Sequence, residues 1–155
     1  MLLNLTKEQV ERYGRYDGDP TLVQLAQYFH LDDADRALIN LRRGDHNKLG
    51  FAVQLGTVRF LGTFLSDPTD VPPVVVRFIC RQLKLLDPSC LAHYTARPVT
   101  PNEHVAEIKR RYGYSNFTDQ PGHFRLVRWL YVRNWLTPEP PRMLFDLTTY
   151  NVKIN

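Results

Sequence analysis

The chain has 155 residues, a formal net charge of +4, 43% hydrophobic and 12% aromatic residues. This apolar content excludes a disordered protein, and the length fits one domain or two small lobes with a real core. No signal peptide is expected, because polar residues follow the three apolar residues 1–3 at once. The most apolar stretch, residues 49–65, is short and carries Gln54 and Arg59, so we expect no membrane span.

The first part of the chain predicts three short helices. A capping residue or Pro precedes each apolar pattern, and Gly14 ends the first helix. The expected ranges are 6–13, 20–29 and 32–41, the last capped by Asp32, with Ala34, Leu38 and Leu41 facing inward. Residues 21–41 have helix-turn-helix proportions, but the carboxylates within 32–35 repel phosphate, so we expect a structural role there.

A long buried helix is predicted at residues 49–65. Two apolar stripes follow helical spacing. They are Leu49, Val53, Gly56, Phe60 and Thr63, and Phe51, Leu55, Val58, Leu61 and Leu65. Gly50, Gly56 and Gly62 weaken a helix but fit close approach by neighbouring helices, and Asp45 or Asn47 is the expected cap. A helix that is apolar on two sides is central to its domain.

Further helices are expected in the second half. Pro72 and Pro73 open one, and Thr100, Pro101 and Glu103 form a capping pattern for another. The predicted ranges are 73–83, 88–95, 100–112, 122–135 and a last helix capped by Thr137. With no strand pattern, the expected fold is all-α, a multi-helix domain with helix-turn-helix-like units. We divide it into an N-terminal lobe, residues 1–98, and a second basic lobe, residues 99–155, truncated at its C-terminal end.

The charge is divided unevenly along the chain. Residues 1–70 hold 8 Lys and Arg against 10 Asp and Glu, a net of −2, whereas residues 71–155 hold 12 against 6, a net of +6. Arg outnumbers Lys 15 to 5, and its planar fork suits phosphates and guanine edges. The second half therefore indicates a polyanion partner, or else a basic protein with solvated arginines.

The helix-turn-helix-like unit at residues 73–95 is the first candidate for DNA contact. In such a unit the second helix enters the major groove and the first crosses the backbone. The expected phosphate contacts are Arg77, Arg81, Lys84 and Arg97, and the expected base-reading residues are Ser89 and His93. The alternative is an ordinary helical hairpin.

Three other basic groups are candidates for phosphate contact. They are Arg42, Arg43 and Lys48 before the central helix, Lys109 and Arg110 at a helix C-terminus, and Arg125, Arg128 and Arg133 opposite an apolar helix face. For the second group the alternative is a solvated, dipole-satisfying end in which Glu107 pairs with Arg111. For the third group it is an acidic neighbouring helix.

No metal or catalytic site is expected. His46 lacks a second histidine at metal-binding spacing, and Cys80 and Cys90 have no second pair to close a metal site. We expect both thiols to be reduced in a cytoplasm. No Gly-rich phosphate loop or nucleophile elbow is present, so we expect no cofactor, no small-molecule substrate and no enzymatic activity.

An ordered set of segments resembles the N-terminal region of the Tn-three-type (class II, replicative) transposases of bacteria. The segment RGDHNKLGFAVQLGTVRFLGTFL, residues 43–65, carries most of the resemblance. Further matching segments are residues 5–9, 13–16, 25–31, 81–83, 103–104 and 135–147. The resemblance implies a DNA-binding region that recognises the terminal inverted repeats of a transposon.

In that family the metal-dependent D-D-E catalytic triad lies far downstream, and this chain ends long before it. The resemblance therefore implies double-stranded DNA and the rest of the transposase as partners, in a bacterial cytoplasm, without strand transfer by this chain. A homodimer remains open. The alternatives are a protein-interaction or dimerisation module with little DNA contact, which the acidic first 70 residues favour, and a fragment with no retained function.

Overall fold

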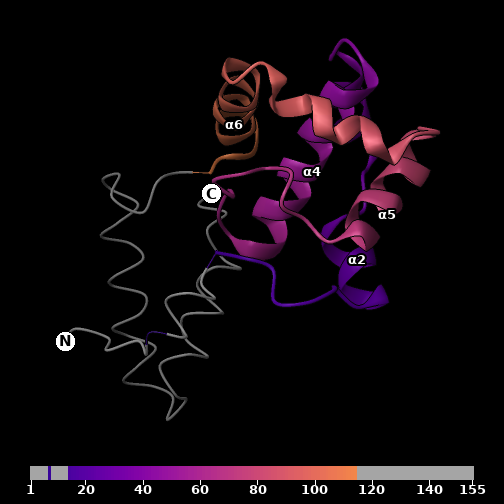
Figure 1. Cartoon of the computed structure of the whole chain (residues 1–155), viewed down its shortest axis with the longest axis vertical. Helices are drawn as coiled ribbons and strands as arrows, with labels where there is room; N and C mark the ends of the chain where they lie inside the picture. Colours follow the sequence, from indigo (N-terminus) through magenta and orange to yellow (C-terminus); the bar gives the residue numbers. More distant parts are fainter. Residues whose placement is uncertain (1–6, 8–13, 115–155) are drawn as a thin grey trace.

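The computed structural model describes residue 7 and residues 14–114, which form helices arranged around a central one (Figure 1). These helices are α2 (Leu22–Tyr28), α3 (Asp33–Asn40), α4 (Asp45–Leu61), α5 (Pro73–Leu83), the 3₁₀ helix η1 (Pro88–Ala96) and α6 (Val99–Tyr112). Within these residues there is no strand, which confirms the all-α prediction. The helices expected at 6–13, at 122–135 and after Thr137 fall wholly or mainly outside the described residues. No described helix is both long and apolar enough to cross a membrane.

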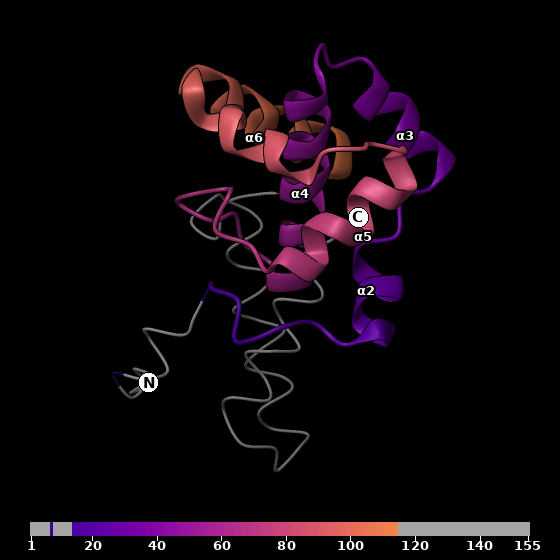
Figure 2. The ribbon, with the colours of Figure 1, turned by 45° about the vertical axis from the view of Figure 1, so that its right-hand side comes forward.

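Helix α4 lies between α6 on one side and α5 on the other, and α2 lies beside α5 in both ribbon views (Figures 1 and 2). All of the other described helices contact α4. Every residue from 49 to 58 is buried, so the prediction of a central helix is confirmed. Helix α6 packs on the same α4 and on η1, whereas the expected division at 98/99 stays a prediction because most of the second lobe is outside the described residues.

The glycines of α4 have two different roles. A Cβ on Gly50 would lie 2.3 Å from the Tyr94 ring, and one on Gly56 would lie 2.4 Å from the Phe29 ring. The expected close approach is therefore confirmed at these two positions, where aromatic rings fill the space. Gly62 instead ends the helix in the left-handed conformation, with φ of 74°. Helix α4 consequently stops at Leu61, before the predicted end at residue 65.

The N-terminal caps of the first helices are made by side chains. Helix α2 begins at Leu22, two residues later than predicted, because Thr21 and Gln24 form a reciprocal capping box. Helix α3 is capped by Asp32 as predicted. The predicted inward face of α3 is wrong in part: Ala34 and Leu41 are exposed, while Asp35 and Ile39 are buried.

Two other predicted caps are wrong. Helix α4 begins after Gly44 with no side-chain cap, and Asn47 instead donates its side-chain N–H to the carbonyl of Arg43 at 2.8 Å. Helix α6 begins at Val99, also without a side-chain cap, so Thr100 does not have the expected role. The end of α6 at Gly113 and the start of α5 at Pro73 are as predicted.

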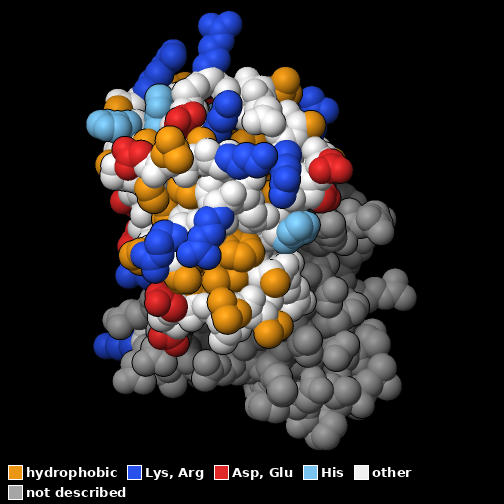
Figure 3. Space-filling view, turned by 90° about the vertical axis from the view of Figure 1, so that its right-hand side faces the viewer, with side chains coloured by type: hydrophobic (Ala, Val, Ile, Leu, Met, Phe, Trp, Pro, Cys, Tyr) orange, Lys and Arg blue, Asp and Glu red, His pale blue; other side chains and the backbone are white. Residues whose placement is uncertain are grey.

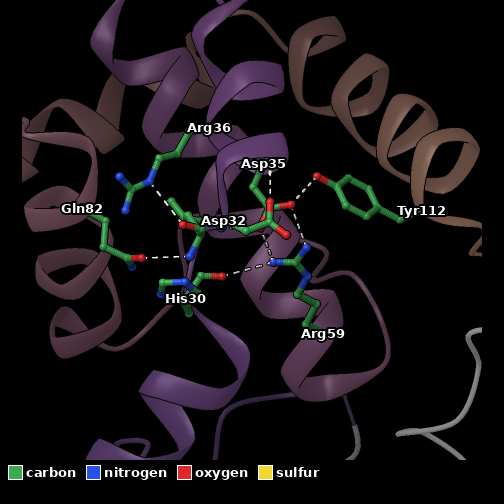
Figure 4. A network of polar contacts seen from close by, with 8 residues as sticks. His30, Asp32, Asp35, Arg36, Arg59, Gln82 and Tyr112 are labelled. Carbon is green, nitrogen blue, oxygen red and sulfur yellow. Dashed lines mark hydrogen bonds and ion pairs between the residues drawn. The ribbon is translucent and has the colours of Figure 1, made fainter.

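A buried ion pair joins α3, α4 and α6 (Figure 4). The Arg59 guanidinium donates two hydrogen bonds to the Asp35 carboxylate, both 2.9 Å, and the Tyr112 hydroxyl donates a third at 2.6 Å. Burial alone would raise the pKa of Asp35, but the hydrogen bonds from Arg59 and Tyr112 and the Arg59 charge hold it below its usual value. Asp35, Arg59 and Tyr112 therefore link α3, α4 and α6 through one carboxylate.

A second polar chain joins α4, η1 and α6. The Gln54 amide donates to the Tyr94 hydroxyl oxygen at 2.7 Å and to the Pro101 carbonyl at 3.1 Å. The Tyr94 oxygen lies 2.7 Å from Nδ1 of His104. Since Tyr94 accepts from Gln54, its own proton is available to donate to Nδ1, which requires a neutral imidazole. Burial, with a smaller contribution from the charge of Arg42, lowers the pKa of His104 to about 4.

Acidification is expected to destabilise the domain through His104. The pKa of His104 is depressed from 6.5 in the unfolded chain to about 4 in the folded domain. The neutral imidazole therefore contributes fully to stability above pH 6.5, and this contribution is lost as the pH falls from 6.5 toward 4. We expect the free energy of unfolding to fall by about 2 kcal/mol over this range. Denaturant unfolding of wild type and of His104→Gln at several pH values measures this effect as the difference between their free energies of unfolding. A difference that does not change with pH would contradict the prediction. His93→Gln, at an exposed histidine, serves as the control.

Candidate nucleic-acid interface

Helix α5 presents a row of cations to solvent. Arg77 and Arg81 are four residues apart, which places them on one face of the helix, and Lys84 follows directly after its last residue. All three are exposed. The opposite face is buried and consists of Val75, Val76, Ile79 and Cys80. The space-filling view toward the α5 and α2 side shows Lys and Arg side chains gathered there, with hydrophobic ones between them (Figure 3). We call Arg77, Arg81 and Lys84 the α5 stripe.

The α5 stripe stands on a firmly anchored helix without any acidic residue. At its C-terminal end, Gln82 accepts a hydrogen bond from the N–H of Leu31 and donates one to the carbonyl of Phe29, both 2.8 Å. These bonds tie α5 to the link between α2 and α3, and Figure 4 shows the first of them at the labelled Gln82. Helix α5 then ends at Leu83, and the capping residue Lys84 adopts a left-handed φ of 56°. The backbone that carries the cations is therefore held by these hydrogen bonds and by the buried face of α5.

The predicted base-reading helix is a 3₁₀ helix rather than an α-helix. Ser89 and His93 are exposed on η1, and Arg97 is exposed just after it. The Ser89 hydroxyl donates to the Asp87 carboxylate at 2.6 Å. The hydrogen bonds from the Ser89 side chain and backbone lower the pKa of Asp87, so a fixed negative charge stands at the start of η1. Leu91 and Tyr94 of η1 are buried against the core, and the Tyr94 ring packs on Gly50.

The three basic residues before α4 differ in their surroundings. Arg42 pairs with Glu107 of α6 at 2.7 Å, and its guanidinium lies 4.8 Å from the Phe51 ring centroid. Its side chain is only 17% exposed, so Arg42 is held inside the domain. Glu107 therefore does not make the pair with Arg111 that its spacing predicts. Arg43 is exposed and Lys48 is half-buried.

The C-terminal end of α6 carries a separate basic group. Arg110 and Arg111 are exposed, and the Lys109 ammonium lies 5.9 Å from the Phe64 ring centroid. Because α4 separates α6 from α5, this group and the α5 stripe lie on different sides of the domain (Figure 1). The last predicted group, Arg125, Arg128 and Arg133, lies outside the described residues.

The described residues contain no cluster of His, Cys, Asp or Glu able to hold a metal ion. Cys80 and Cys90 are both free thiols. Burial raises the pKa of Cys80 to about 11 and raises that of Cys90 as well, so neither thiol is activated as a nucleophile. The functional feature that the fold does offer is a cationic helix face.

Two features, the Asp35–Arg59–Tyr112 cluster and the Arg42–Glu107 pair, could not be expected from the sequence. Their members come from different helices, and local spacing carries no signal for contacts of that kind. The residues of the α5 stripe were expected near phosphates as part of a helix-turn-helix-like unit, but only the structure shows that they are exposed on, and directly after, a firmly held helix.

Fold and surface together define an all-α domain with a cationic helix face. Residues 5–153 match a family described as "Domain of unknown function (DUF4158)", and the chain belongs to this family. The chain is 52% identical over 145 residues to "Transposase for transposon gamma-delta" of Escherichia coli (strain K12), covering 94% of the chain and 14% of that protein. The resemblance to Tn-three-type transposases is thereby confirmed.

Two further relatives are also transposases. The chain is 34% identical over 114 residues to "Transposase for transposon Tn1546" of Enterococcus faecium, covering 74% of the chain and 11% of that protein. It is 39% identical over 85 residues to "Transposase for transposon Tn501" of Pseudomonas aeruginosa, covering 55% and 8% respectively. The chain thus spans only a small part of each of these relatives and corresponds to an N-terminal transposase region.

Proposed function

We propose that this region is the part of a Tn-three-type transposase that binds duplex DNA at the ends of the transposon. The observation that carries the proposal is the α5 stripe, three exposed cations on and directly after one firmly held helix that has no carboxylate. The transposase relatives support it, since their reaction acts on transposon DNA. The terminal inverted repeat is the proposed binding site, and the chemistry of strand transfer belongs to other parts of the transposase.

The physical basis is the release of counterions from DNA. Each phosphate neutralised by Lys or Arg releases condensed cations, so affinity falls as salt rises. Arg77 and Lys84 are seven residues apart, about 10 Å along the helix, so the α5 stripe spans about three base-pair steps. Arg42 is excluded from this surface because Glu107 and Phe51 hold it. No cofactor is required for binding of this kind.

The chain is expected to bind labelled transposon-end duplex with an affinity that falls steeply with salt, measured by fluorescence anisotropy. Replacing all of the α5 stripe by Ala should weaken binding at least about tenfold, and the salt slope should fall by about 1 for each cation that no longer neutralises a phosphate. The matched control replaces three exposed cations elsewhere, Arg43, Arg110 and Arg111, by Ala. Both variants remove the same charge, so only the position of that charge differs.

Four outcomes would overturn the proposal or its placement on α5. Absence of duplex binding at low salt, or binding without salt dependence, would overturn DNA binding. Equal weakening by the two triple variants would show that the α5 stripe is not the DNA surface. Binding that survives both variants unchanged would move the surface to another part of the chain.

A second candidate function is an interaction module for the rest of the transposase or for a second copy. The adjacent Leu22 and Val23 favour it, since they are 82% and 74% exposed on the first turn of α2. Analytical ultracentrifugation tests it directly. A DNA-independent dimer that disappears in Leu22→Ser/Val23→Ser would support this role, and a monomer at all concentrations would count against self-association.

A further inference from the structure

We infer that α5 itself lies in the major groove and that Arg77 and Arg81 determine which sequence is recognised by contacting guanine edges. This inference rests on the proposed function and adds to it the element that reads the bases. It differs from the sequence-based expectation, in which α5 crosses the backbone and η1 enters the groove.

Among the described helices, α5 is the only one suited to a groove. Helix α4 is buried at every residue from 49 to 58, and neither α2 nor η1 contains Lys or Arg. Helix α3 carries Asp33 and Asp35 in its first turn. The cations of α6 are confined to its last turn, after Glu103 and Glu107. A carboxylate facing the groove would repel the phosphates on both sides, and α5 has none.

Helix η1 is further disfavoured by its own hydrogen bonds. The Ser89 hydroxyl already donates its hydrogen bond to Asp87. The Asp87 carboxylate stands at the N-terminal end of η1, the end that would approach DNA. Leu91 is buried, and Tyr94 is held by Gln54 and seated on Gly50. These residues of η1 face the core as Val75 and Ile79 of α5 do, so the two helices differ in their exposed faces. The exposed face of η1 carries no Lys or Arg, whereas that of α5 carries Arg77 and Arg81.

The spacing on α5 fits base pairs. Arg77 and Arg81 are one helical turn apart, a rise of about 6 Å, which is close to two base-pair steps. Each guanidinium fork can donate to both O6 and N7 of one guanine, and the major groove is wide enough for an α-helix. Lys84, at the end of the helix, is a point charge suited to a flanking phosphate. The structure thus gives the two arginines a reading role and Lys84 a positioning role.

Arg77→Lys/Arg81→Lys tests the reading role, because it keeps both charges and removes both forks. We expect unchanged affinity for a scrambled duplex and an unchanged salt slope, with the preference for transposon-end duplex reduced at least about tenfold. The matched control, Arg110→Lys/Arg111→Lys on α6, should leave both affinities unchanged. Circular dichroism should show the same melting temperature for all variants, since the four side chains are exposed.

A change in the DNA gives an independent readout. Replacing guanine by 7-deazaguanine in the transposon end removes the N7 acceptor. Wild-type protein should then lose preference for that duplex, and the Arg77→Lys/Arg81→Lys variant should lose little more. This pairing of protein and base change separates contact with guanine from any indirect effect of the substitutions.

The outcomes distinguish this inference from the proposed function. If Ser89→Ala/His93→Ala abolishes the preference while Arg77→Lys/Arg81→Lys keeps it, η1 reads the sequence and the inference is overturned, although DNA binding stands. An equal loss on specific and scrambled duplexes in the Lys variant would show phosphate contact only and would also overturn it. If wild-type chain binds neither duplex, the proposed function itself fails.

Discussion

Replacing Arg59 by Ala is expected to destabilise the domain by about 3–5 kcal/mol. Asp35 is only 2% exposed, and two of its hydrogen bonds come from Arg59. Without the guanidinium, the domain must either bury an uncompensated carboxylate or protonate it, and both cost free energy. Tyr112 would remain as a single side-chain donor from another helix. Urea unfolding followed by circular dichroism measures the loss.

The control for Arg59 is Arg36→Ala on α3. The Arg36 side chain donates from its Nε to the Leu31 carbonyl at 3.2 Å, and its removal should cost no more than about 1 kcal/mol. The cost of Arg59→Ala should shrink as the pH falls, because the unpaired buried Asp35 of the variant is protonated before the paired Asp35 of wild type, whose pKa is lowered. A loss no larger than that of Arg36→Ala would contradict the importance of this buried pair.

Local signals predicted much of the fold correctly. Asp32 caps α3, Pro73 begins α5 and Gly113 ends α6, because each acts through the backbone within a few residues. The buried character of α4 also follows from its own sequence, since apolar residues on two sides leave no face for solvent. In each case the physics that decides the structure is contained in one short segment.

The errors arise where distant contacts override local preference. Thr100 forms a plausible capping pattern, yet Pro101 is buried with its carbonyl bound to Gln54, and α6 begins at Val99 instead. The inward face of α3 was wrong because Asp35, which is polar, is buried through a partner 24 residues away in sequence. Hydrophobic periodicity assigns a charged residue to solvent and cannot identify such a partner.

The candidate site was predicted only in part. Arg77, Arg81 and Lys84 were grouped as phosphate contacts of one helix-turn-helix-like unit, and all three are exposed. Arg42 was grouped with Arg43 by sequence proximity, although Glu107 holds it inside the domain. Charge counting gives each arginine the same weight. Burial and pairing then decide which of them remain exposed to a partner.

Gly50→Ala is the other substitution with a large expected effect, a net loss of about 3 kcal/mol, because its Cβ would overlap the Tyr94 ring. Three ring atoms would lie 2.3–2.4 Å from the new carbon. The ring cannot simply move, since its hydroxyl is bonded to Gln54 and lies 2.7 Å from His104. Higher helix propensity of Ala offsets only about 1 kcal/mol. Thermal and urea unfolding would measure the net change.

A double-mutant cycle with Tyr94→Ala shows whether the ring is the cause. Tyr94→Ala alone should destabilise strongly, because it empties a core position and leaves the buried Gln54 and His104 without their shared partner. In that background, however, Gly50→Ala has room for its methyl group and should be neutral or stabilising by up to about 1 kcal/mol. The coupling energy should therefore have the same magnitude as the overlap itself. If Gly50→Ala costs as much without the ring as with it, the glycine is required for a property of the α4 backbone and not for the seating of η1.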